Sequence, residues 1–81
     1  MSGSEQIALN GSEIWAYVVE LDGGLRMRLS LDDWERIGLH RGQRVPLRRP
    51  GHRDEWLFLA EVVELPPLAW IVLANRIRVA G

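Results

Sequence analysis

The sequence predicts an all-β protein: a five-stranded small barrel, SH3-like or OB-like, with one short helix between the second and third strands. Short segments in which apolar and polar residues alternate indicate half-buried strands. Turn residues separate these segments at close intervals, as in small barrels. The 81 residues include no cysteine, so one hydrophobic core must stabilise the chain without disulfides.

The first two strands are predicted over residues 13–21 and 25–31. The first segment is rich in β-branched and aromatic residues, which favour strands. In the second segment every other residue is apolar, and Arg26 and Arg28 lie between, so the strand has one apolar and one basic face. The intervening Asp-Gly-Gly at residues 22–24 is typical of a hairpin turn, so the two strands are expected to pair.

A helix of about two turns is predicted immediately after the second strand. Ser30 is placed to cap it, because Asp33 stands three residues later, as in a capping box. Gly38 suits the left-handed residue that ends a helix, and Leu39 can then pack back on Trp34. The helix is therefore expected to be short and to lie against the core.

Three more strands are predicted in the second half of the chain, over residues 44–48, 56–65 and 68–73. The two prolines at 66 and 67 separate the last two strands, which form a long apolar hairpin. A further segment at residues 76–79 alternates arginine with apolar residues and is expected to close the chain.

The chain is expected to form one domain. Residues 1–12 are interpreted as a flexible N-terminal lead or an edge strand, and residues 13–81 as a single small β-barrel domain. The predicted core consists of the inward residues of the strands and the helix: Ile14, Val18, Leu25, Met27, Leu29, Leu31, Trp34, Ile37, Leu39, Val45, Leu47, Phe58, Val63, Ile71, Leu73, Ile77 and Val79.

The composition favours a soluble, non-catalytic, cytoplasmic protein. No signal peptide is visible, and the apolar runs are too short to span a membrane. Two histidines and no cysteine leave few groups for nucleophilic or acid–base chemistry, so we expect no enzyme activity and no cofactor. His40, His52 and Asp54 lie in different loops without a helical pair, so no metal site is expected.

Within residues 25–49, a strand leads to a short helix, then to the segment IGLHRGQRV at residues 37–45, and then to a strand. This arrangement resembles the Mop/TOBE modules, small OB-like barrels that bind molybdate-type oxyanions or are appended to transporter ATPases. The same Gly-Leu-x-x-Gly-x-x-Val spacing is similar to that of the SH3-like accessory domain of ferrous-iron transport and of the swapped-hairpin transition regulators. The resemblance implies a small barrel. Because only two strands precede the helix and a long hairpin follows it, no binding residue is carried over.

Between the predicted helix and the loop after the third strand, the chain contains arginine and no acid. If Arg26 and Arg28 lie beside Arg44 and Arg48 on neighbouring strands, with Arg49 following, one side of the barrel is basic. Such a side can hold an oxyanion, nucleic acid or an acidic protein. No aromatic residue is interleaved with these arginines as a base-stacking platform needs, so a solvated face with surface ion pairs is the favoured interpretation.

The predicted hairpin is apolar on both sides, whereas one barrel interior can cover only one of them. The short helix is too small to cover a strand of this length. A second copy of the chain is the expected cover, because tryptophan with arginine at the rim is typical of an interface core. The predicted interface residues are Trp56, Phe58, Trp70 and Val72.

These observations predict a non-catalytic binding or assembly module that self-associates as a homo-oligomer, most simply a dimer. The alternative is a module that binds anions or nucleic acid through its arginine-rich face. Neither interpretation requires a membrane.

Overall fold

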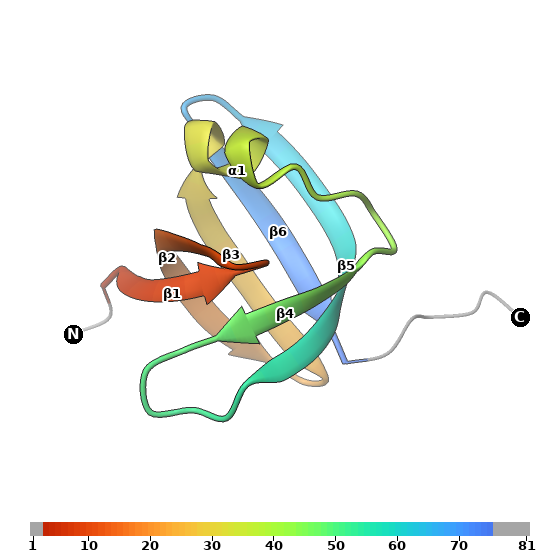
Figure 1. The fold of residues 1–81 in the computed structure, drawn as a ribbon. Coiled ribbons are helices and arrows are strands. Elements are labelled where there is room, and N and C mark those ends of the chain that lie inside the picture. Colours follow the sequence, from red (N-terminus) through yellow and green to blue (C-terminus); the bar gives the residue numbers. More distant parts are fainter. Residues whose placement is uncertain (1–2, 76–81) are drawn as a thin grey trace, which may run out of the picture.

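The structure is a computed structural model that describes residues 3–75, and this part of the chain forms a closed antiparallel barrel with one short helix at one end (Figure 1). The strands follow one another around the barrel in the order β1-β2-β3-β6-β5-β4. In chain order the elements are β1 (Glu5–Leu9), β2 (Ser12–Leu21), β3 (Gly24–Ser30), α1 (Leu31–Ile37), β4 (Arg44–Arg48), β5 (Glu55–Leu65) and β6 (Leu68–Ala74).

The predicted all-β class and the position of the helix are confirmed, but the predicted count of five strands is wrong. β1 is the sixth strand of the described part. It pairs with β2 on one side and with β4 on the other, and so closes the barrel. Ile7 and Leu9 of β1 are buried. A strand of only five residues gives a weak alternation signal, and its pairing with β4 is a contact distant in sequence. The predicted segment 76–79 lies outside the described residues.

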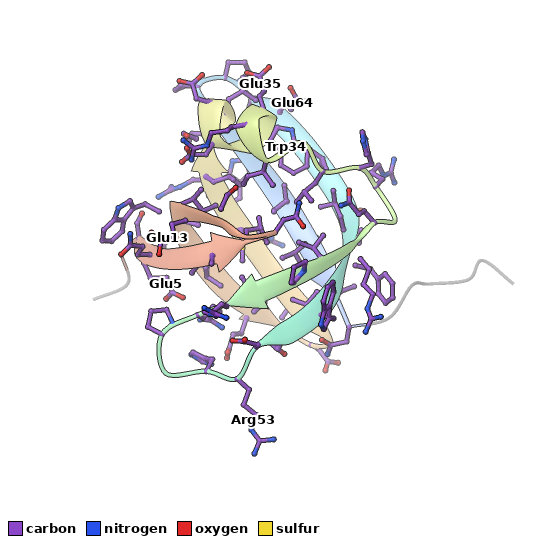
Figure 2. The ribbon with its side chains drawn as sticks, viewed as in Figure 1. Glu5, Glu13, Trp34, Glu35, Arg53 and Glu64 are labelled. Carbon is purple, nitrogen blue, oxygen red and sulfur yellow. The ribbon has the colours of Figure 1, made fainter. Side chains whose placement is uncertain are left out.

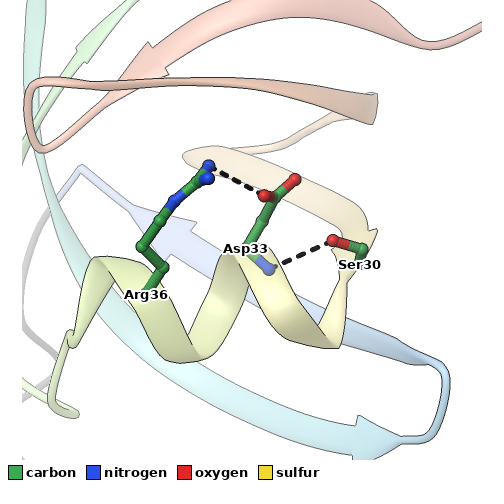
Figure 3. Close-up of polar contacts among 3 residues, drawn as sticks. All are labelled: Ser30, Asp33 and Arg36. Carbon is green, nitrogen blue, oxygen red and sulfur yellow. Dashed lines mark hydrogen bonds and ion pairs between the residues drawn. The ribbon is translucent and has the colours of Figure 1, made fainter.

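The helix begins and ends where its capping residues predict (Figure 3). The Ser30 hydroxyl accepts a hydrogen bond from the Asp33 backbone N–H at 3.1 Å, and Arg36 donates to the Asp33 carboxylate at 2.8 Å. Gly38 has a φ of 69°, and its N–H bonds to the Trp34 carbonyl oxygen. These local contacts end α1 after seven residues and turn Trp34 toward the barrel.

β5 pairs with different neighbours along its length. Its first residues pair with β4, and its later residues pair with β6. The register shifts between Leu59 and Glu61, so Ala60 is an inserted residue that reverses the inward and outward alternation. Val62 consequently packs against the core, whereas Val63 is 51% exposed.

The bulge and the inward pattern of β5 overturn two core predictions. Phe58 is only half-buried and Val63 is exposed, because Leu57 and Leu59 face inward before the bulge and Val62 faces inward after it. Val18 and Leu31 pack against the core without being fully buried. Ile77 and Val79 lie outside the described residues.

Most of the remaining core was predicted correctly. The confirmed buried residues are Ile14, Leu25, Met27, Leu29, Trp34, Ile37, Leu39, Val45, Leu47, Ile71 and Leu73. The core also contains residues that the prediction lacked, which are Ile7, Leu9, Ala16, Leu57, Leu59 and Ala69. Four of these six come from β1 and β5, the strands whose inward face the sequence determined least.

Trp34 closes the end of the barrel beneath α1 (Figure 2). We expect Trp34→Ala to lower the free energy of unfolding by about 3–5 kcal/mol, because it leaves a cavity in a small core. Thermal and denaturant unfolding measure this change. Trp15→Ala is the control, since Trp15 is 61% exposed and its loss should change stability by less than about 1 kcal/mol. Equal melting temperatures for the two variants would contradict the packing role of Trp34.

Candidate interaction surface

The structure separates the arginines that the sequence grouped on one face. Arg26 and Arg28 lie on β3, and Arg44 and Arg48 lie on β4. The β5–β6 hairpin is inserted between these two strands, so they are not neighbours in the barrel. Three strand spacings amount to roughly 14 Å along the sheet. The two arginine pairs therefore belong to different parts of the surface.

Arg49 lies immediately after β4 and points inward, with only 9% of its surface exposed. Its Nε donates to Glu5 Oε1 at 2.8 Å, and its Nη1 lies 3.5 Å from Glu20 Oε1. Glu5 belongs to β1 and Glu20 to β2. Arg49 thus ties the barrel-closing strand and its neighbour to the end of β4. Its guanidinium is occupied by these carboxylates.

The two arginines of β4 have different surroundings. Arg48 forms an exposed ion pair with Asp54 at 3.4 Å. The Arg44 guanidinium lies 4.9 Å from the centroid of the Trp56 ring, a cation–π distance. Trp56 remains 56% exposed, so the Arg44–Trp56 pair stands on the surface of the β4–β5 ladder.

A row of outward side chains crosses four neighbouring strands at one level. Tyr17 of β2 is opposite Arg28 of β3, Arg28 is opposite Trp70 of β6, and Trp70 is opposite Val63 of β5. The Arg28 guanidinium lies 5.1 Å from the Tyr17 centroid and 5.7 Å from the Trp70 centroid. Arg28 is therefore held between two aromatic rings.

This arrangement overturns one premise of the sequence interpretation. No aromatic residue is interleaved with the arginines along the chain, but strand pairing places Tyr17 and Trp70 on either side of Arg28. The signal that could have predicted this was the register of the Asp-Gly-Gly hairpin, because hairpin register determines which side chains are opposite and here pairs Tyr17 with Arg28.

The next row on the same surface carries charges at two positions. Arg26 of β3 is opposite Val72 of β6, and Val72 is opposite Glu61 of β5. The parts of the two rows that lie on β3, β6 and β5 form a surface around β6 that we call the outer hairpin face. Its residues are Arg26, Arg28, Glu61, Val63, Trp70 and Val72.

The four predicted interface residues all lie outside the buried core. Trp70 and Val72 are half-buried and belong to the outer hairpin face. Trp56 pairs with Pro46 of β4. Phe58 pairs with Arg44 of β4 and with Ala74 of β6, two residues beyond Val72, so Phe58 connects the β4–β5 ladder with the outward side of β6. The prediction lacked Glu61 and Val63, because only the bulge turns them outward.

The helix does not cover the outer hairpin face. α1 lies across one end of the barrel, where it contacts β3 and β6 (Figure 1). Glu35 of α1 and Glu64 of β5 lie at this same end (Figure 2). In contrast, Arg53 extends away from the barrel in the β4–β5 loop at the other end (Figure 2). Among residues 3–75, the outward side of the hairpin is covered only in part, by the arginine stacked on Trp70.

Neither a cluster of metal-ligating side chains nor a helix that could span a membrane is present among the described residues. Among residues 3–75, no group of three or more histidine, cysteine or acidic side chains is close enough to hold a metal ion. No helix in this part of the chain is long and apolar enough to cross a membrane. Two surface hollows flank the β2–β3 turn, and His52 and Asp54 line one of them.

We found no family model that matches the chain, and no curated protein or solved structure that is significantly similar to it. The resemblance of residues 25–49 to Mop/TOBE modules therefore stays a hypothesis.

The neighbouring Arg48 and Arg49 allow a direct test of which arginine is structural. We expect Arg49→Ala to lower the free energy of unfolding by about 1–3 kcal/mol, because it leaves the Glu5 and Glu20 carboxylates close together without their shared cation. Arg48→Ala should cost less than about 1 kcal/mol, since its ion pair is exposed. Denaturant unfolding measures both values, and an Arg48→Ala variant at least as unstable as Arg49→Ala would contradict this assignment.

Proposed function

We propose that the protein is a non-catalytic assembly module with an OB-like barrel, and that it forms a homodimer through the outer hairpin face. The observation that carries the proposal is the row of Tyr17, Arg28, Trp70 and Val63, which crosses four strands on the outside of the barrel. Tyrosine, tryptophan and arginine are the residue types that contribute most to binding energy at protein interfaces.

The stacking of Arg28 favours binding because it fixes a long side chain before a partner arrives. A free arginine loses rotamer freedom when it enters an interface, whereas a guanidinium already held between Tyr17 and Trp70 has lost much of it. The same stacking leaves the planar guanidinium beside apolar groups. Such a surface is suited to a partner that is itself partly apolar.

Exposed apolar residues at the end of the hairpin extend this surface. Val63 is 51% exposed and Leu65 is 56% exposed, and both belong to the part of β5 that pairs only with β6. Continuous apolar surface of this kind is usually covered in soluble proteins. A second copy is the simplest cover, because a two-fold axis makes one surface patch serve both partners.

Trp70 is the central test of the homodimer. We expect Trp70→Arg to weaken dimerisation by at least about 2 kcal/mol, or roughly 30-fold in the dissociation constant, because it opposes two unpaired guanidinium groups in an apolar contact. Sedimentation velocity over a range of micromolar concentrations measures the dissociation constant. Trp15→Arg is the matched control, since Trp15 lies on β2 opposite Gln6 of β1, away from the outer hairpin face. A single-chain mass for the wild type throughout this range would refute the proposal.

A second candidate is an anion-binding or nucleic-acid-binding module, supported by the aromatic rings beside Arg28 and Arg44. Aromatic residues with arginine form stacking platforms for single-stranded nucleic acid. In OB-like barrels the face of the second and third strands binds oligonucleotides, and here that face carries Arg26 and Arg28. The net charge of −1 and the separation of the arginines favour the assembly proposal over this one.

The second candidate predicts salt-sensitive binding. If nucleic acid or an oxyanion binds, its affinity must fall steeply with salt through counterion release. Arg26→Glu must weaken binding at the face of β3, and Arg44→Glu with Arg48→Glu must weaken binding at β4. Both side chains are exposed, so this double variant should stay folded. Fluorescence anisotropy with single-stranded DNA and RNA, and calorimetry with molybdate and phosphate, measure binding. Absence of binding at low salt would remove this candidate.

A further inference from the structure

The outer hairpin face carries opposite charges on the two flanks of β6. Arg26 of β3 and Glu61 of β5 are at the same level along the strands, with Val72 between them. Both charged side chains are exposed, and neither has an ion-pair partner among residues 3–75. One flank of the face is therefore positive and the other negative.

We propose that two copies pack through this face about a two-fold axis parallel to β6, so that Arg26 of each copy faces the partner's Glu61. The inference rests on the proposed homodimer and specifies its orientation. Rotation about a line parallel to β6 exchanges the two flanks, so β3 of one copy lies opposite β5 of the other. Both ion pairs then form at the same time, because the interface is isologous.

The other two-fold arrangement of the same face brings like charges together. If the axis lies in the contact plane but perpendicular to the strands, each flank faces the same flank of the partner. Arg26 and Arg28 of β3 then oppose the arginines of the partner, while Glu61 faces the acidic flank. Like charges opposed across an interface are disfavoured, so the axis parallel to β6 is selected.

A partner is less suited to pair with the edge of β5 than to pack on the outer hairpin face. Residues 61–65 pair only with β6, so the opposite edge of this segment has no strand beside it in the described part of the chain. However, the bulge at Ala60 and the charges of Glu61 and Glu64 protect this edge. Bulges and charged side chains are features by which proteins block pairing at strand edges.

The side-chain lengths fit the curvature of a barrel. Facing sheets pack about 10 Å apart, and a convex barrel is closest to its partner at the central strand. Trp70 and Val72 of β6 then meet the same residues of the partner. On the flanking strands the gap widens, and the long side chains of Arg26 and Glu61 can span it.

Charge exchange tests the orientation. In the Arg26→Glu variant, the introduced glutamate faces the partner's Glu61 in each of the two contacts. In the Glu61→Arg variant, the introduced arginine faces the partner's Arg26. Each single variant should therefore raise the dimer dissociation constant at least about tenfold. An equimolar mixture of the two variants should form heterodimers, because one contact then pairs the introduced glutamate with the introduced arginine and the other contact keeps the native pair. The double variant that carries both substitutions in one chain should likewise recover the homodimer. Sedimentation velocity measures the dissociation constants, and native mass spectrometry identifies the heterodimer.

Matched controls exclude a general effect of charge. Glu13→Arg on β2 and Arg53→Glu in the β4–β5 loop make the same charge changes away from the face and should leave dimerisation unchanged (Figure 2). A wild-type dimer whose single variants stay dimeric, or whose mixture fails to recover, overturns this orientation and leaves self-association standing. A monomeric wild type overturns the proposed homodimer itself.

Discussion

The bend of β5 is the constraint on which the rest of the structure depends. β5 pairs with β4 through its first residues and with β6 through its later residues, so it bends between two neighbours of the closed barrel. An unbroken alternation through all eleven residues would keep one face inward throughout. The inserted Ala60 instead changes the inward set from Leu57 and Leu59 to Val62. The insertion of Ala60 therefore determines both which residues of β5 enter the core and which lie on the outer surface.

Helix capping and barrel closure are stabilised in different ways. The two ends of α1 are fixed by contacts within nine residues of sequence, from Ser30 to Gly38, so its extent is a local property. Closure between β1 and β4 involves few backbone pairs, Ala8 with Arg48 and Leu9 with Leu47. The buried Arg49 adds ionic contacts to Glu5 and Glu20 at the same end of β4. The weakest ladder of the barrel is therefore supported by side chains.

The arginines of the barrel make three distinct kinds of contact. Arg49 is held by carboxylates and is structural, and Arg48 forms an exposed pair with Asp54. Arg28 and Arg44 lie over aromatic rings and cover apolar area that would otherwise face water. Arg26 has neither kind of partner among the described residues. A count of positive charge along the chain does not distinguish these roles, because each depends on which strand lies alongside.

The sequence by itself determined the elements whose signals are local. Alternation predicted β3, the serine and glycine caps predicted both ends of α1, and Asp-Gly-Gly predicted the β2–β3 hairpin. Tertiary structure alone decided that residues 5–9 close the barrel, that the β5–β6 hairpin separates the arginines of β3 from those of β4, and that the alternation reverses at Ala60. The physical reason is that periodicity fixes which residues share a face within one strand. The order of the strands and the site of a bulge are set by contacts between residues far apart in the chain.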